Sequence, residues 1–64
     1  MTGGGSQREV LFEFVRVGNA VKVTAVDAAS GTEATIVGAA GTSEEVLKRN
    51  ALGKLDYVMR RRGG

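Results

Sequence analysis

The chain has 64 residues, with nine Lys or Arg against seven Asp or Glu and a formal net charge of +2. It contains neither Cys nor His, which excludes disulfides, zinc sites with sulfur or imidazole ligands, and catalysis by a nucleophile paired with His. A domain this small removes only about 60 % of the unfolded chain's surface from water, so a partner surface would add to its stability.

The two ends of the chain differ in composition from the part between them. Gly-rich sequence at both ends predicts a flexible leader over residues 1–8 and a flexible tail over residues 63–64, which flank one domain over residues 9–62. No apolar run of signal-peptide or membrane-spanning length follows the leader. We therefore expect a cytoplasmic protein with no membrane partner.

Two apolar runs in the first half of the chain predict β-strands over residues 9–17 and 21–26. Gly18 and Asn19 lie between them and suit a two-residue hairpin turn. Pairing the residues that flank this turn sets the register of the two strands. Directly opposed residues of antiparallel strands project from the same face, so the register predicts which side chains lie together. The pairs expected on one face are Phe14 with Val23, Phe12 with Ala25, and Val10 with Asp27.

A second turn is predicted where the Asp27 side chain can accept hydrogen bonds from backbone amides ahead of it and Gly31 can adopt a positive φ. A third strand then covers residues 32–37, and a loop over residues 38–41 ends the sheet. The register expected from this turn pairs Asp27 with Thr32, Ala25 with Ala34, and Val23 with Ile36. Both turns therefore direct the same side chains to one apolar face.

Thr42, followed three residues later by Glu45, predicts a capping box that opens a helix reaching residue 62. Acidic residues in the first turn and three Arg at the end fit the helix dipole. The apolar stripe of this helix comprises Leu47, Ala51, Leu52, Leu55, Val58 and Met59. The expected fold class is α+β, a three-stranded antiparallel β-meander packed against one C-terminal α-helix in the order β-β-β-α. The predicted core comprises Val10, Phe12, Phe14, Val21, Val23, Ala25, Ala34 and Ile36 beneath Leu47, Ala51, Leu55 and Val58.

Short motifs along these predicted elements carry a resemblance to a known family. They are Leu11-Phe12-Glu13-Phe14, Arg16-Val17-Gly18-Asn19, Val21-Lys22-Val23, Asp27, Gly31-Thr32-Glu33, Leu47-Lys48-Arg49, Ala51-Leu52, Lys54-Leu55 and Tyr57-Val58. With them the chain resembles an uncharacterised family of short bacterial proteins, a domain of unknown function, over residues 10–62. The resemblance implies the meander and helix, and it implies no activity or site.

The sheet face away from the helix carries more aliphatic residues than a solvated face requires. They are Leu11, Val15, Val17, Val26 and Val37. Two interpretations stay open, since single apolar residues are common on surfaces but a sheet covered on one side should alternate more strictly. We expect self-association in a homodimer through this face or through an edge strand, because a two-fold dimer needs only one self-complementary patch. An unidentified protein partner is the other occupant considered.

The helix carries most of the basic residues, which suggests an alternative function. They are Arg49, Lys54, Arg60, Arg61 and Arg62. Such residues contact phosphates in nucleic-acid-binding modules, and they also occur as solvated charges that complement a helix dipole. Glu44 and Glu45 make the helix start acidic, which argues against phosphate contacts at that end.

Catalysis is not expected from this sequence. Glu13, Glu33 and Lys22 project from the same outer face, where such charges form ordinary cross-strand pairs. General acid–base chemistry needs a partly dry pocket, and one small core leaves little room for it. We expect no catalytic residue, no cofactor and no metal, and the function most consistent with the sequence is a small non-enzymatic interaction or structural module.

Overall fold

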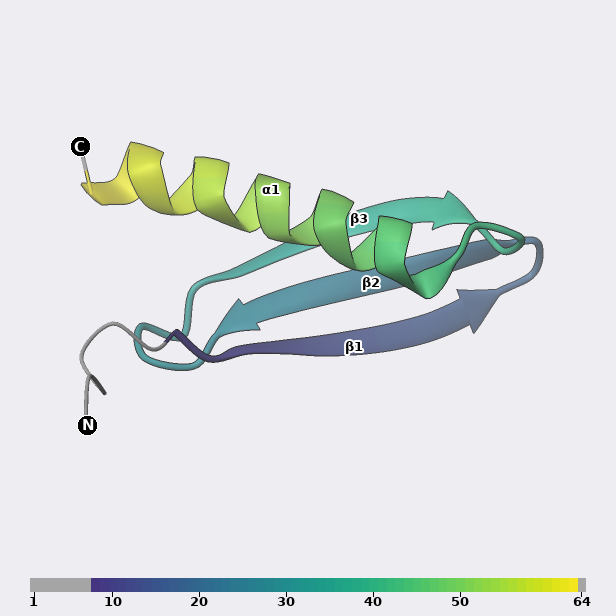
Figure 1. Ribbon diagram of the computed structural model, residues 1–64, viewed down its shortest axis with the longest axis horizontal. Helices are drawn as coiled ribbons and strands as arrows, with labels where there is room; N and C mark the ends of the chain where they lie inside the picture. The colour runs from purple at the N-terminus through teal and green to yellow at the C-terminus, as the bar shows by residue number, and fades with distance from the viewer. Residues whose placement is uncertain (1–7, 64) are drawn as a thin grey trace.

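The computed structural model describes residues 8–63. Its elements are β1 (Val10–Val17), β2 (Ala20–Asp27), β3 (Glu33–Ala39) and α1 (Glu44–Gly63). The strands form one antiparallel sheet in the order β1-β2-β3, and α1 lies across one face of it (Figure 1). The predicted α+β class and β-β-β-α order are confirmed. Most of the predicted leader, up to residue 7, and residue 64 of the predicted tail lie outside the described residues.

The first hairpin turn forms as predicted. Gly18 has a φ of 60° and no non-glycine residue described has a positive φ, a combination typical of a type II′ turn. The predicted register between the first two strands is confirmed, because Phe14 pairs with Val23, Phe12 with Ala25, and Val10 with Asp27.

The second turn is also confirmed in its details. The Asp27 amide donates to the Thr32 carbonyl at 2.8 Å, and the Ser30 amide donates to the Asp27 carboxylate at 3.0 Å. Gly31 adopts a φ of 77°. The register that follows pairs Ala25 with Ala34 and Val23 with Ile36, as expected.

The prediction that the third strand ends before Gly38 is wrong. β3 continues through Gly38 and Ala39, and the Ala40 amide donates to the Asn19 carbonyl at 2.9 Å beyond it. A Cβ at Gly38 would lie 2.5 Å from Cδ2 of Leu47. Glycine here therefore marks a close approach of the helix to the strand and does not mark a loop.

The predicted capping box is also wrong, by one residue. The helix begins at Glu44, and the hydroxyl of Ser43 accepts the Val46 amide at 3.3 Å, so Ser43 is the N-cap. Thr42 instead donates its amide to the Ala39 carbonyl at 3.0 Å and belongs to the preceding turn. Glu45 is consequently the second helical residue, where it faces the positive end of the dipole but cannot complete the box.

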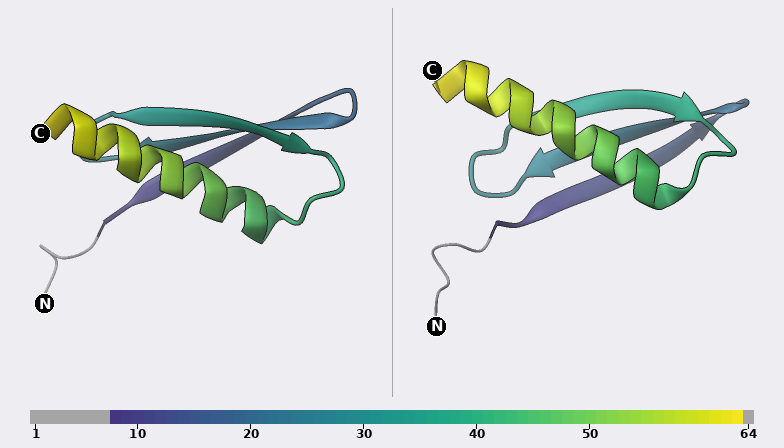
Figure 2. Two further views of the ribbon diagram at one scale, coloured as in Figure 1. Left: turned by 90° about the horizontal axis from the view of Figure 1, so that it is seen from above. Right: turned by 45° about the horizontal axis from the view of Figure 1, so that its top comes forward.

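The hydrophobic core lies between α1 and the sheet, as predicted. The buried residues are Val23, Ala25, Ala34, Leu47, Ala51 and Leu55. The partly buried residues around them are Val10, Phe12, Phe14, Val21, Ile36, Leu52, Val58 and Met59. The helix runs obliquely over the sheet and packs chiefly on β2 and β3 (Figure 2). The inner side chains of β1 therefore stay half-covered.

Candidate functional site

The outer face of the sheet, which points away from α1, carries the five aliphatic residues predicted for self-association. Val37 on β3 is 69 % exposed, and on β1 the exposed fractions are 62 % for Val17, 53 % for Leu11 and 41 % for Val15. Val26 on β2 is half-buried. Successive residues of a strand point to opposite faces, so the observed register places all five on the same side.

Polar residues interrupt this outer face in a regular order. Lys22 on β2 lies between Val15 on β1 and Val37 on β3. In the next row, the Oγ1 atoms of Thr24 and Thr35 are 3.1 Å apart, within hydrogen-bonding distance. The row beside the first hairpin turn is wholly apolar and comprises Val17, Ala20 and Ala39. The outer face thus combines exposed aliphatic groups with a few charges.

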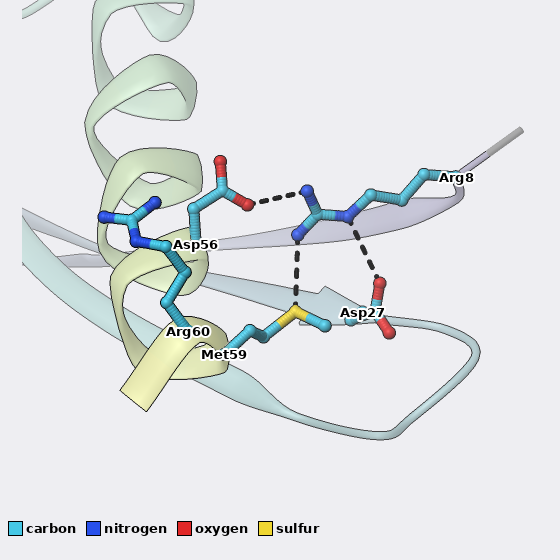
Figure 3. Close-up of a pocket in the computed structure, with 5 residues that line it drawn as sticks. All are labelled: Arg8, Asp27, Asp56, Met59 and Arg60. Carbon is cyan, nitrogen blue, oxygen red and sulfur yellow. Dashed lines mark hydrogen bonds and ion pairs between the residues drawn. The ribbon is translucent and has the colours of Figure 1, made fainter. Parts of the chain in front are cut away.

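At the end of the molecule away from that hairpin, a polar cluster joins the start of the described chain to the end of α1 (Figure 3). Arg8 donates from Nη1 to Asp56 at 2.6 Å and from Nε to Asp27 at 3.3 Å, and its Nη2 lies 3.4 Å from Met59 Sδ. With Arg60 these residues line an open depression of about 520 Å³. The guanidinium of Arg8 already has two carboxylate partners, so the cluster holds together segments that are distant in sequence. We call this set of contacts around Arg8 the clasp.

Asp27 is the buried member of this cluster, with only 4 % of its surface exposed. Its Oδ2 accepts hydrogen bonds from the Ser30 hydroxyl at 2.8 Å and the Ser30 amide at 3.0 Å. These bonds, with a smaller contribution from Arg8, lower the pKa of Asp27 despite its burial. Ser30 Oγ also lies 2.9 Å from Thr32 Oγ1, which accepts from Arg62 at 3.2 Å. A carboxylate held this way stays ionised and supports the turn, and it is poorly suited to act as a base.

Three of the five basic helix residues form hydrogen bonds within the chain. Lys54 donates to the Thr35 carbonyl at 2.7 Å. Arg61 donates to the Tyr57 hydroxyl at 3.3 Å and its guanidinium lies 5.7 Å from the centre of that ring, while Arg62 turns toward the sheet. The remaining two have exposed side chains and are Arg49 and Arg60. Three of the five side chains are thus engaged within the chain, and two of these, Lys54 and Arg62, reach toward β3.

The described residues offer few groups for chemistry. Among residues 8–63, no three His, Cys, Asp or Glu side chains lie close enough together to hold a metal ion. In the same part of the chain, no helix combines the length and the apolar character needed to cross a membrane. What the arrangement presents is surface: an exposed aliphatic sheet face and the backbone of the edge strands.

Sequence reasoning missed the clasp formed by Arg8 and Asp56. Arg8 had been assigned to the leader, and its partner lies 48 residues further along the chain. The one available signal was the place of Asp56 at the border of the apolar helix stripe, where a charged group can reach the sheet end.

The fold and the exposed surface define a class of protein, a small α+β domain whose single helix covers one side of a three-stranded sheet. Within that class, residues 7–62 match the family described as a domain of unknown function, DUF6898, and the chain belongs to this family. No curated protein matches the chain, and no solved structure does. The resemblance to an uncharacterised family is confirmed, and it brings no activity to the site.

Proposed function

We propose that this protein is a small non-enzymatic module that self-associates through the outer face of its sheet to form a homodimer. The observation that carries the proposal is the exposure of the aliphatic side chains on that face, which ranges from 41 % at Val15 to 69 % at Val37. Full burial of one such side chain contributes roughly 1.5–3 kcal/mol. Within the described residues, α1 packs on the opposite face, so the outer face is left for a partner to cover.

A second copy is the partner best supported by the residues on this face. In a two-fold dimer, each contact between two different residues occurs twice, so a small patch contributes twice to the association free energy. The charges on the face are of both signs, with Glu13 and Glu33 negative and Lys22 positive. A copy turned about a two-fold axis can therefore place a carboxylate near an ammonium group, which avoids a like-charge contact.

Nucleic-acid binding, the alternative drawn from the sequence, gains no support from the basic residues of α1. Lys54, Arg61 and Arg62 each bond within the chain, so free phosphate contacts would first have to displace those bonds. The cytoplasmic location and the bacterial origin of the family stay predictions from the sequence.

The test is the mass of the protein in solution as a function of concentration, by sedimentation equilibrium. Val37→Glu places a carboxylate in the outer face and should weaken self-association about tenfold or more, the loss expected when one buried Val contact is removed. Asn50→Glu is the matched control, because it makes the same change in charge on the exposed side of α1.

A wild-type protein that stays monomeric at high micromolar concentration would contradict the proposal. So would a Val37→Glu variant that associates as strongly as Asn50→Glu. Salt-sensitive binding of mixed-sequence DNA or RNA by a monomeric protein would favour the nucleic-acid alternative instead.

A further inference from the structure

The two edges of the sheet differ in how their backbone groups are satisfied. The Ala28 amide donates to the Glu9 carbonyl at 3.0 Å, which shows that odd-numbered residues of the first strand bond to β2. Because backbone groups alternate in direction along an antiparallel strand, the even-numbered residues face outward. These outward residues of β1 are Val10, Phe12, Phe14 and Arg16.

The outer edge of β3 is occupied by a charged side chain. The same alternation turns the Thr35 carbonyl outward, and Lys54 Nζ donates to it at 2.7 Å. A lysine on a strand edge is a common device against pairing with another chain. Among the described residues, no hydrogen bond reaches the outward backbone groups of β1, which leaves an open edge eight residues long.

The side chains beside the open edge are also incompletely covered. Phe12 and Phe14 point to the inner face, but α1 packs chiefly on β2 and β3, so both rings are only half-buried. Lys48 Nζ lies 5.7 Å from the centre of the Phe12 ring on the helix side. A further strand beside β1 would cover the other flank of these two rings.

We propose that β1 pairs antiparallel with β1 of a second copy. The result is one continuous sheet with three strands from each copy and both helices on the same face. A two-fold pairing uses the same β1 edge of both copies, so it closes after two copies. Lys54 at the Thr35 carbonyl opposes further pairing along the β3 edge.

The charges exclude some registers of this β1–β1 pairing, which we call the seam. A two-fold axis at Glu13 would set two carboxylates directly opposite each other, and an axis at Phe12 would set Arg16 opposite Arg8; both arrangements are unfavourable. An axis at Phe14 avoids like charges. It sets the two Phe14 rings side by side and Phe12 opposite the copy's Arg16, where ring and guanidinium attract.

The seam is distinct from the outer face, because it uses the backbone edge and the inner rings. Each contact by itself gives a dimer, and both together would give a tetramer or a larger assembly, so they need separate tests. Arg16→Pro removes an outward amide without removing a bond of the β1–β2 ladder, since the Arg16 amide faces away from β2. Arg16→Ala is the matched control, which loses the side chain and keeps the amide.

We expect Arg16→Pro to weaken self-association about tenfold or more relative to Arg16→Ala, since several seam hydrogen bonds depend on that alignment. Circular dichroism checks that both variants keep their secondary structure. A folded Arg16→Pro variant that associates as strongly as Arg16→Ala overturns the seam.

Amide hydrogen exchange tests the seam without altering β1. In the Val37→Glu variant, whose outer face is blocked, we expect exchange at the amides of Phe12, Phe14 and Arg16 to slow as protein concentration rises. The outward amide of Glu33 on the opposite edge serves as the internal control. If the exchange rate at these β1 amides does not depend on protein concentration, the pairing of two copies is overturned. This holds even if an extended peptide of another protein binds the edge. Failure of the outer-face proposal would appear separately, as an unchanged mass of Val37→Glu.

Discussion

Asp27 illustrates how one side chain organises this fold. It ends β2, accepts hydrogen bonds from Ser30 and Arg8, and is almost entirely buried. Its partners are Ser30 in the β2–β3 turn and Arg8, two residues before the start of β1, so a single carboxylate joins segments distant along the chain. The sequence pattern predicts the role of Asp27 in the turn, but it does not predict the contact of Asp27 with Arg8.

The lowered pKa of Asp27 makes a prediction for acid stability. The folded pKa lies below the ordinary value of 3.8, so this carboxylate stabilises the fold above that value, and the contribution is lost as pH falls through the lower folded pKa. Asp27→Asn should therefore unfold at a lower temperature at neutral pH, and its midpoint should fall less than the wild type's in acid. Thermal unfolding followed by circular dichroism from neutral pH to about pH 2 measures this.

Glu9→Gln is the control for this series, because it removes an exposed carboxylate that has no role in either proposed contact. If Asp27→Asn and the wild type lose stability in acid by the same amount, the carboxylate does not have the stabilising role assigned to it.

At the scale of the element, the start of α1 depends on which hydroxyl caps it. Thr42 and Ser43 are adjacent and both have the chemistry of an N-cap, so the pattern Thr-x-x-Glu misled the sequence interpretation by one residue. The Ala39 carbonyl draws the Thr42 amide into the preceding turn, and Ser43 is left facing the Val46 amide.

The corrected cap leads to a second prediction. Ser43→Ala should lower the free energy of unfolding by about 1 kcal/mol, because it removes the acceptor for one helix amide. Thr42→Ala should cost clearly less, since the Thr42 side chain has no part in the cap. Urea unfolding of both variants measures the difference, and a larger loss for Thr42→Ala would restore the original interpretation.

At the scale of the whole molecule, the thin core and the open surfaces belong together. Among the described residues, only six apolar residues are buried, and the outer face and the β1 edge stay exposed to solvent. A fold of this size gains stability when a partner covers such surfaces. Self-association is therefore expected to be part of how the domain is stabilised.

This coupling between association and stability gives a third prediction. The thermal midpoint of the wild type should rise with protein concentration, because association favours the folded chain by mass action. A Val37→Glu, Arg16→Pro double variant should show a lower and concentration-independent midpoint. Circular dichroism melts over about a hundredfold concentration range test this, and a constant wild-type midpoint would count against both interfaces.

Local sequence patterns predict three strands and a helix, both turn registers and the inner face of the sheet. These features depend on neighbours within a few residues: Gly18 in one turn, Asp27 and Gly31 in the other, and the period of apolar residues in each segment. Once two turns set the registers, the pairs that form the core follow from the two-residue period of a strand.

The position of α1 on the sheet depends instead on contacts between residues distant in the chain. Close packing of Leu47 on Gly38 brings the helix toward β3, and Lys54 and Arg62 anchor it on that side. That placement leaves β1 half-covered with an open edge, and it lets Asp56 meet Arg8. These contacts join residues far apart in the chain, so no local pattern encodes them, and shape and packing select them once the chain has folded.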